Sequence, residues 1–181
     1  MIAHSTRSMV LRVLFVCTGN ICRSPTAERL LTSYAAAAGL NDVVATSAGT
    51  RAVIGHPIHP EAKRVLLNLG GEGEEFAARQ LNTRLAARAD LVLTMTRAHR
   101  STVLEMAPQC LRRTYTVVEA ARLVTELNAR SVADLANLRP HLGTNQVADI
   151  ADPIGQRPEV FAAIGEEIAG ALRPLLELCR G

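Results

Sequence analysis

The chain lacks tryptophan and is poor in aromatic residues of any kind, which make up 3 % of its 181 residues. So few aromatic side chains leave little material for the base-stacking surfaces that bind single-stranded nucleic acids. A large excess of one charge is also lacking, because 20 basic and 17 acidic groups give a net charge of +3. Nucleic-acid-binding domains usually carry a dense basic face, so we expect no nucleic-acid partner.

Long hydrophobic runs and a cysteine framework are missing as well. Residues 1–10 hold no apolar run typical of a secretory signal, and Glu166, Glu167 and Arg173 interrupt the apolar stretch near the C-terminus. We therefore expect no membrane-spanning segment and no membrane partner. Four cysteines in a chain of this length are too few for a disulfide scaffold. Together these absences favour the reducing cytosol, and we expect a cytoplasmic protein.

The composition that remains is that of a folded domain, with 48 % apolar and 20 % charged residues. We expect a flexible tail over residues 1–10 and a single domain over residues 11–181. Short β-branched segments alternate with amphipathic helical ones. We predict strands at 12–16, 43–47, 90–96 and 113–118, and helices at 25–38, 60–69, 81–88, 99–106, 119–138 (interrupted) and 158–179, the last kinked or broken at Pro174. This alternation predicts an α/β three-layer sandwich with a central four-stranded parallel sheet.

The loop after the first predicted strand carries the most informative motif. It lies at the carboxyl end of that strand, where open parallel sheets bind their ligands. Its residues are Cys17, Thr18, Gly19, Asn20, Ile21, Cys22, Arg23, Ser24 and Pro25. The loop has neither the Gly-Lys-Ser/Thr ending of a Walker loop nor the glycine spacing of a dinucleotide loop. A cysteine followed six positions later by an arginine indicates an oxyanion site instead.

Each part of this loop has a physical use in holding and attacking a phosphate group. The five residues between Cys17 and Arg23 can form a semicircle of inward-pointing backbone amides. Gly19 permits the tight turn, and Asn20 tolerates left-handed dihedral angles. Arg23 can bind two phosphate oxygens, and the positive potential favours the thiolate of Cys17. Ser24 can cap the following helix, opened by a proline, and donate its hydroxyl to the sulfur.

The loop closely resembles the nucleophile loop of the low-molecular-weight protein tyrosine phosphatases. The resemblance extends over nearly the whole chain, through the strings Thr26-Ala27-Glu28, Ser47-Ala48-Gly49-Thr50, Ala78-Arg79-Gln80-Leu81, Ala89-Asp90-Leu91-Val92-Leu93-Thr94-Met95 and Asp152-Pro153. It implies hydrolysis of a phosphorylated protein through a cysteinyl phosphate, with no cofactor and no metal. Phosphate and other oxyanions are then the expected ligands of Cys17 and Arg23, and of Thr18, Ile21, Cys22 and the rest of the loop.

The same resemblance assigns the general acid to Asp152. Asp149 lies close by, but only Asp152 precedes a proline, Pro153, which restricts it to extended dihedral angles. Asp152 would protonate the leaving oxygen and then serve as the base for the water that hydrolyses the phosphocysteine. For Asp149 the favoured interpretation is turn capping.

Cys22 and the region after the third strand leave two alternatives open. In this family the cysteines that match Cys17 and Cys22 can form a disulfide that protects the nucleophile, and a packing role for Cys22 is equally compatible. Thioredoxin-coupled arsenate reductases share the fold and the Cys/Arg loop. They need resolving cysteines near the end of the third strand, where Met95 and Thr96 stand, so this alternative is disfavoured.

The residues expected to wall the substrate pocket are aliphatic. Val53 and Ile154 occupy places where family members often carry aromatic residues. Bacterial protein arginine phosphatases are similar in fold and typically have threonine where this loop has Ile21, whereas isoleucine goes with the tyrosine branch. One methyl-for-hydroxyl difference can decide whether a guanidino phosphate fits. We therefore expect a phosphotyrosine or general aryl phosphatase, with phosphoarginine as the alternative substrate.

Overall fold

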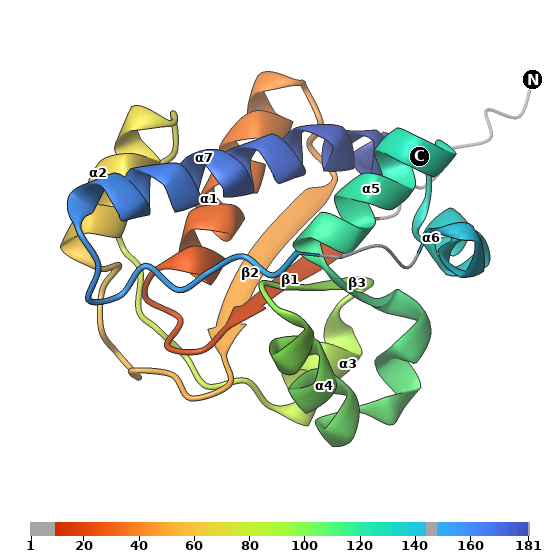
Figure 1. The fold of residues 1–181 in the computed structure, drawn as a ribbon, viewed down its shortest axis with the longest axis horizontal. Helices are drawn as coiled ribbons and strands as arrows, with labels where there is room; N and C mark the ends of the chain where they lie inside the picture. Colours follow the sequence, from red (N-terminus) through yellow and green to blue (C-terminus); the bar gives the residue numbers. More distant parts are fainter. Residues whose placement is uncertain (1–9, 144–147, 181) are drawn as a thin grey trace, which may run out of the picture.

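A computed structural model describes residues 10–143 and 148–180 of the chain (Figure 1). The tail predicted over residues 1–10 lies almost wholly outside the described residues. Between these limits the strands are β1 (Leu11–Cys17), β2 (Val43–Gly49), β3 (Leu91–Thr94) and β4 (Thr114–Thr116). The α-helices are α1 (Arg23–Ala37), α2 (Pro60–Asn68), α3 (Thr83–Arg88), α4 (Arg97–Met106), α5 (Val117–Leu127), α6 (Val132–Leu138) and α7 (Pro158–Leu175).

The strands form one four-stranded sheet in the order β2-β1-β3-β4. All neighbouring strands are parallel, as the alternation of strands and helices predicts. Cys17 at the end of β1 pairs with Gly49 of β2, and Val16 pairs with Thr94 of β3. The loops that follow these three strands therefore meet at one edge of the sheet, on both sides of Cys17.

Helices cover both faces of the sheet, which explains the continuous apolar run of β1. Val13 and Phe15 pack into the core on the side of α1, α2, α5 and α7. Leu14 and Val16 point to the opposite face and pack with α3 and α4. Figure 1 shows these helices as separate layers on either side of the strands. The predicted three-layer sandwich is confirmed, and its central strand leads directly into the Cys17 loop.

The fourth strand ends earlier than the sequence predicts. The predicted strand 113–118 includes Val117 and Val118, but both lie in the first turn of α5. Thr116 caps this helix: its hydroxyl accepts from the Glu119 amide at 3.0 Å, and the Glu119 carboxylate accepts from the Thr116 amide at 3.3 Å. This reciprocal capping box outweighs the β preference of the two valines, so the prediction was wrong at these residues.

The last helix stops where its proline indicates. The α-helical part of α7 ends at Leu175, directly after Pro174, and the chain continues as a 3₁₀ turn over Leu176–Cys179. Pro174 itself still lies inside the α-helix, and the chain leaves the α-helical conformation within two residues of it, close to the predicted break. Neither α7 nor any other helix in residues 10–143 and 148–180 is long and apolar enough to cross a membrane.

Candidate active site

The loop around Cys17 is shaped by a close approach to the end of β2. A Cβ atom at Gly49 would clash with the carbonyl oxygen of Thr18, so this position needs glycine. The residue with a left-handed backbone is Asn20, at φ 56°. A Cβ atom at Gly19 would meet only ordinary contacts at 3.5 Å, and its φ is not positive. The turn at residue 19 therefore does not use the conformational freedom of glycine, contrary to the prediction, and the position that needs glycine is Gly49.

The carbonyl groups of the loop point away from its centre. Those of Cys17, Thr18, Gly19 and Ile21 accept hydrogen bonds of 2.7–2.9 Å from the amides of residues 50, 51, 53 and 59. In a trans peptide the N–H of the next residue points opposite to the carbonyl. The amides of residues 18, 19, 20 and 22 are thus directed to the inner side, beside the amino-terminal end of α1. This arrangement forms an anion-binding nest.

A buried network holds the Cys17 sulfur from below. The Asn20 side-chain amide donates to Ser24 Oγ and to Ser47 Oγ at 2.9 Å each, and its oxygen accepts from the Arg79 amide. Ser24 Oγ lies 2.9 Å from Cys17 Sγ. Because Asn20 donates to the Ser24 oxygen, the Ser24 hydrogen is available to the sulfur, and a thiolate at Cys17 would accept it.

Ser24 has one of its two predicted roles. It contacts the sulfur as expected, but it does not cap α1, which begins at Arg23 with Cys22 as the N-cap residue. Pro25 accordingly lies inside the first turn instead of opening the helix. The cap position carries no side-chain hydrogen bond. This leaves the first amides of the helix directed at the anion nest instead of at a capping side chain.

Arg23 and Asp152 meet at the side of the loop. Arg23 is buried, with its Nη1 donating to the carbonyl of Ile150 at 2.9 Å and its Nη2 lying 3.2 Å from Asp152 Oδ2. Asp152 is half-exposed, and its other carboxylate oxygen accepts from the Ile154 amide at 3.2 Å. Asp149 binds Arg97 instead, accepting from the Arg97 amide at 2.9 Å. It thus holds the first residue of α4 across 52 positions of the chain and does not cap its own turn, contrary to the prediction.

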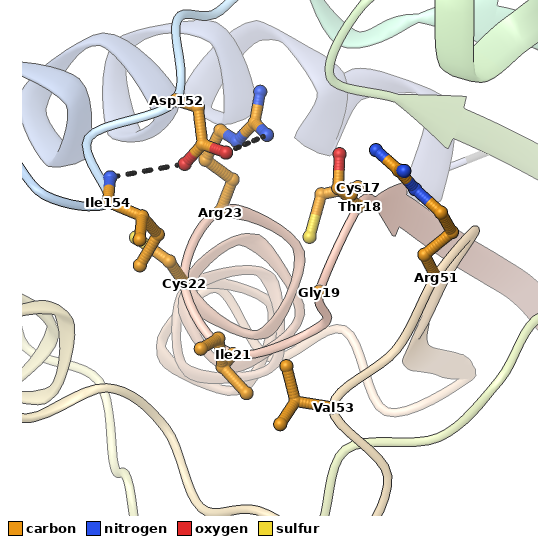
Figure 2. Close-up of a pocket in the computed structure, with 10 residues that line it drawn as sticks. All are labelled: Cys17, Thr18, Gly19, Ile21, Cys22, Arg23, Arg51, Val53, Asp152 and Ile154. Carbon is orange, nitrogen blue, oxygen red and sulfur yellow. Dashed lines mark hydrogen bonds and ion pairs between the residues drawn. The ribbon is translucent and has the colours of Figure 1, made fainter.

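These residues surround a cavity of about 360 Å³ (Figure 2). Its lining consists of Cys17, Thr18, Gly19, Ile21, Cys22, Arg23, Arg51, Val53, Asp152 and Ile154. The predicted site residues Asn20 and Ser24 lie behind the loop and support it. The walls are aliphatic, as expected. Among the described residues, no group of three or more His, Cys, Asp or Glu side chains is placed to hold a metal ion.

Cys22 lies within the nucleophile loop, but its side chain is buried. Burial, and next the nearby Cys17, raise the pKa of Cys22 to about 12. It is therefore a neutral thiol near pH 7, which suits a packing role in the resting protein. All four cysteines are free thiols in the structure.

Sequence reasoning missed two residues of the site, Arg51 and His99. Arg51 follows the end of β2 and reaches the mouth of the cavity. His99 lies in α4, after β3, and its Nε2 is 2.8 Å from Thr18 Oγ1. The sequence feature that could have identified both residues is their position, because each follows one of the two strands that flank β1. Only the strand order places them beside the Cys17 loop.

His99 is held in its neutral form. It is 7 % exposed, and burial, followed by the charge of Arg23, lowers its pKa from 6.5 to about 4. Between pH 6.5 and about 4, the His99 side chain is therefore protonated in the unfolded chain and neutral in the folded protein. We therefore expect the free energy of unfolding to decrease as the pH falls from 6.5 to 4, with up to about 3 kcal/mol arising from His99.

Urea unfolding at several pH values tests this expectation. His99→Gln, which cannot titrate, should show a shallower loss of stability between pH 7 and about 4 than the wild type. The exposed His56 provides the matched control, and His56→Gln should keep the wild-type slope. An unchanged slope in His99→Gln would contradict the neutral buried imidazole.

The comparisons with known proteins agree with this geometry. Residues 12–180 match the family model described as low molecular weight phosphotyrosine protein phosphatase. The chain is 42 % identical over 101 residues to the low molecular weight protein-tyrosine-phosphatase Wzb of Escherichia coli (strain K12), a match that covers 56 % of this chain and 65 % of that protein. The aligned part thus spans just under two thirds of that relative.

Solved structures are similar over more of the chain. A low molecular weight protein tyrosine phosphatase from T. tengcongensis has 32 % identity and a TM-score of 0.75, over 92 % of this chain and 98 % of that one. The YwlE arginine phosphatase from Geobacillus stearothermophilus has 32 % identity and a TM-score of 0.72, over 92 % and 91 %. Vibrio vulnificus Wzb, in complex with benzylphosphonate, has 26 % identity and a TM-score of 0.68, over 90 % and 94 %. With its family match running from the first strand to the last turn, the chain belongs to the low molecular weight phosphotyrosine protein phosphatase family.

Proposed function

We propose that this chain hydrolyses phosphotyrosine in proteins, and related aryl phosphomonoesters, through a cysteinyl-phosphate intermediate on Cys17. One observation carries the proposal. The Cys17 sulfur lies at the base of an amide-lined loop that opens into a cavity, with the Arg23 guanidinium and the Asp152 carboxylate 3.2 Å apart at its side. A nucleophile, an anion-binding group and an acid thus share one cavity.

In the first step the Cys17 thiolate attacks phosphorus in line with the leaving oxygen. The sulfur–phosphorus bond forms, the phosphorus–oxygen bond of the ester breaks, and Asp152 gives its proton to the leaving phenolate. The loop amides and Arg23 hold the equatorial oxygens. Asp152 is paired with Arg23, whose Nη2 lies 3.2 Å from Asp152 Oδ2. A bound phosphate would take its place on Arg23, which leaves the Asp152 carboxyl group free to face the leaving oxygen.

In the second step water attacks the phosphorus of the cysteinyl phosphate. The water gives a proton to the Asp152 carboxylate, the sulfur–phosphorus bond breaks, and inorganic phosphate leaves. The departing sulfur is again a thiolate, which Ser24 can stabilise by donating its hydroxyl from 2.9 Å. Because a thiolate nucleophile must stay reduced, we propose the cytosol as the compartment of action.

The lining of the cavity supports an aryl substrate over a guanidino one. Ile21, Val53 and Ile154 present apolar surface around the loop. A phenyl ring can pack against such walls without losing hydrogen bonds, whereas phosphoarginine would bring N–H donors that these side chains cannot accept. The similarity to the YwlE arginine phosphatase keeps phosphoarginine as the second candidate substrate.

Hydrolysis of two matched phosphopeptides in the presence of EDTA tests the proposal. The peptides carry phosphotyrosine or phosphoarginine in the same sequence, and released phosphate is measured. We expect kcat/KM to be about tenfold or more higher for phosphotyrosine, because the discrimination rests on unpaired donors of the guanidino group. The opposite preference would replace the proposal by arginine phosphatase activity. No hydrolysis of either peptide by the folded, reduced protein would overturn it.

A further inference from the structure

Arg51 lies at the mouth of the cavity. Its guanidinium group has no ion-pair partner among residues 10–143 and 148–180. Its backbone amide donates to the Thr18 carbonyl at 2.9 Å, which fixes the segment after β2 against the nucleophile loop. The Arg51 side chain is exposed and lines the cavity. Figure 2 shows it on the opposite side of the mouth from Asp152 and Ile154. The anchored backbone places this flexible cation beside any substrate that enters.

The charged side chains that line the cavity are unequal in number. Its lining holds two guanidinium groups, those of Arg23 and Arg51, and one carboxylate, that of Asp152. Asp152 is paired with Arg23 at 3.2 Å. The Arg51 guanidinium forms no ion pair or hydrogen bond with another residue in the described part of the chain. Arg23 and the loop amides suffice to hold the phosphate group, so the second cation is available for a different anion.

We propose that Arg51 binds a carboxylate side chain of the substrate that lies next to the phosphorylated residue. The inference rests on the proposed function, because it requires a phosphorylated peptide in the cavity. With the phosphate in the loop and the aryl ring between the aliphatic walls, the flanking peptide residues cross the mouth. Neighbouring residues of an extended peptide are about 3.3–3.6 Å apart along the chain, within reach of an arginine side chain at the rim. A guanidinium binds a carboxylate through two parallel hydrogen bonds.

Phosphotyrosine peptides that differ only in the residues flanking the tyrosine provide the test. One peptide carries aspartate on both sides, the second asparagine and the third lysine. For the wild type we expect kcat/KM to be about fivefold higher with aspartate than with asparagine, a preference that weakens at high salt. Arg51→Gln should lose this preference. Arg51→Glu should reverse it, so that the lysine peptide becomes the better substrate.

A matched variant separates the proposed contact from a general charge effect. Arg173 is exposed and lies near the end of α7. The chain that follows this helix lines a second cavity together with Leu11, at the opposite end of β1 from Cys17. Arg173→Glu changes the net charge by the same amount as Arg51→Glu. It should keep the wild-type ratio between the aspartate and asparagine peptides. Loss of the preference in both variants would overturn the proposal in favour of long-range attraction.

Three other results would also overturn the inference. An identical aspartate-to-asparagine ratio in the wild type and Arg51→Gln would show that no carboxylate is recognised there. An equal loss with all three peptides and with para-nitrophenyl phosphate would assign Arg51 to the phosphate group itself. If the wild type hydrolyses none of the phosphotyrosine peptides, the proposed function fails, and this inference fails with it.

Discussion

Replacing Cys17 with serine is expected to lower kcat/KM for para-nitrophenyl phosphate by at least about 10⁴-fold, because a serine hydroxyl in this loop is a far weaker nucleophile than a thiolate. The amides and Arg23 that form the anion nest are untouched by this change. The variant should therefore still bind inorganic phosphate. Steady-state hydrolysis with EDTA present measures the first effect, and isothermal titration calorimetry measures the second.

Cys179 offers a control with the same change of atoms. It lies in the 3₁₀ turn after α7 and lines the cavity at the opposite edge of the sheet. Burial raises its pKa to about 11, so it is a neutral thiol near pH 7. Cys179→Ser should keep nearly full activity. Substantial turnover by Cys17→Ser, or an equal loss in Cys179→Ser, would contradict Cys17 as the nucleophile.

Replacing Asp152 with asparagine is expected to separate substrates by the stability of their leaving groups. With phenyl phosphate, whose phenolate needs a proton as it departs, kcat/KM should fall by about 10²–10⁴-fold, the usual contribution of a positioned general acid. With para-nitrophenyl phosphate the leaving anion is stabilised by its nitro group, and the loss should be much smaller. Because kcat/KM is not affected by the later hydrolysis of the phosphocysteine, this ratio reports on the acid alone.

The same substitution at Asp149 provides the control for Asp152. Asp149 binds the amide and side chain of Arg97 at 2.9 and 3.4 Å and does not line the cavity. Asp149→Asn should change both substrates by the same small factor. If Asp152→Asn lowers kcat/KM equally for the two substrates, the residue has a structural or binding role and is not the acid.

Helix ends show where local sequence patterns failed. The β-branched pair Val117 and Val118 favoured a longer strand, yet the Thr116–Glu119 capping box starts α5 at Val117. In the nucleophile loop, the serine and proline of Ser24-Pro25 predicted a later helix start than the one observed at Arg23. In both places two local preferences compete, and hydrogen bonds of the helix end decide between them.

The sequence alone determined the chemistry of the loop and the class of the fold. Cys17, Arg23 and the residues between them are contiguous, so their spacing is legible without coordinates, and strand–helix alternation implies a parallel sheet. The family resemblance had also assigned Asp152 to the site, but only the tertiary structure showed its contact with Arg23 and added Arg51 and His99. The β2-β1-β3 order brings Arg51 and His99 to the two sides of the loop, and the segment before α7 brings Asp152 onto Arg23. Such contacts depend on how strands from separate parts of the chain pair, and the pattern of any single segment does not encode that pairing.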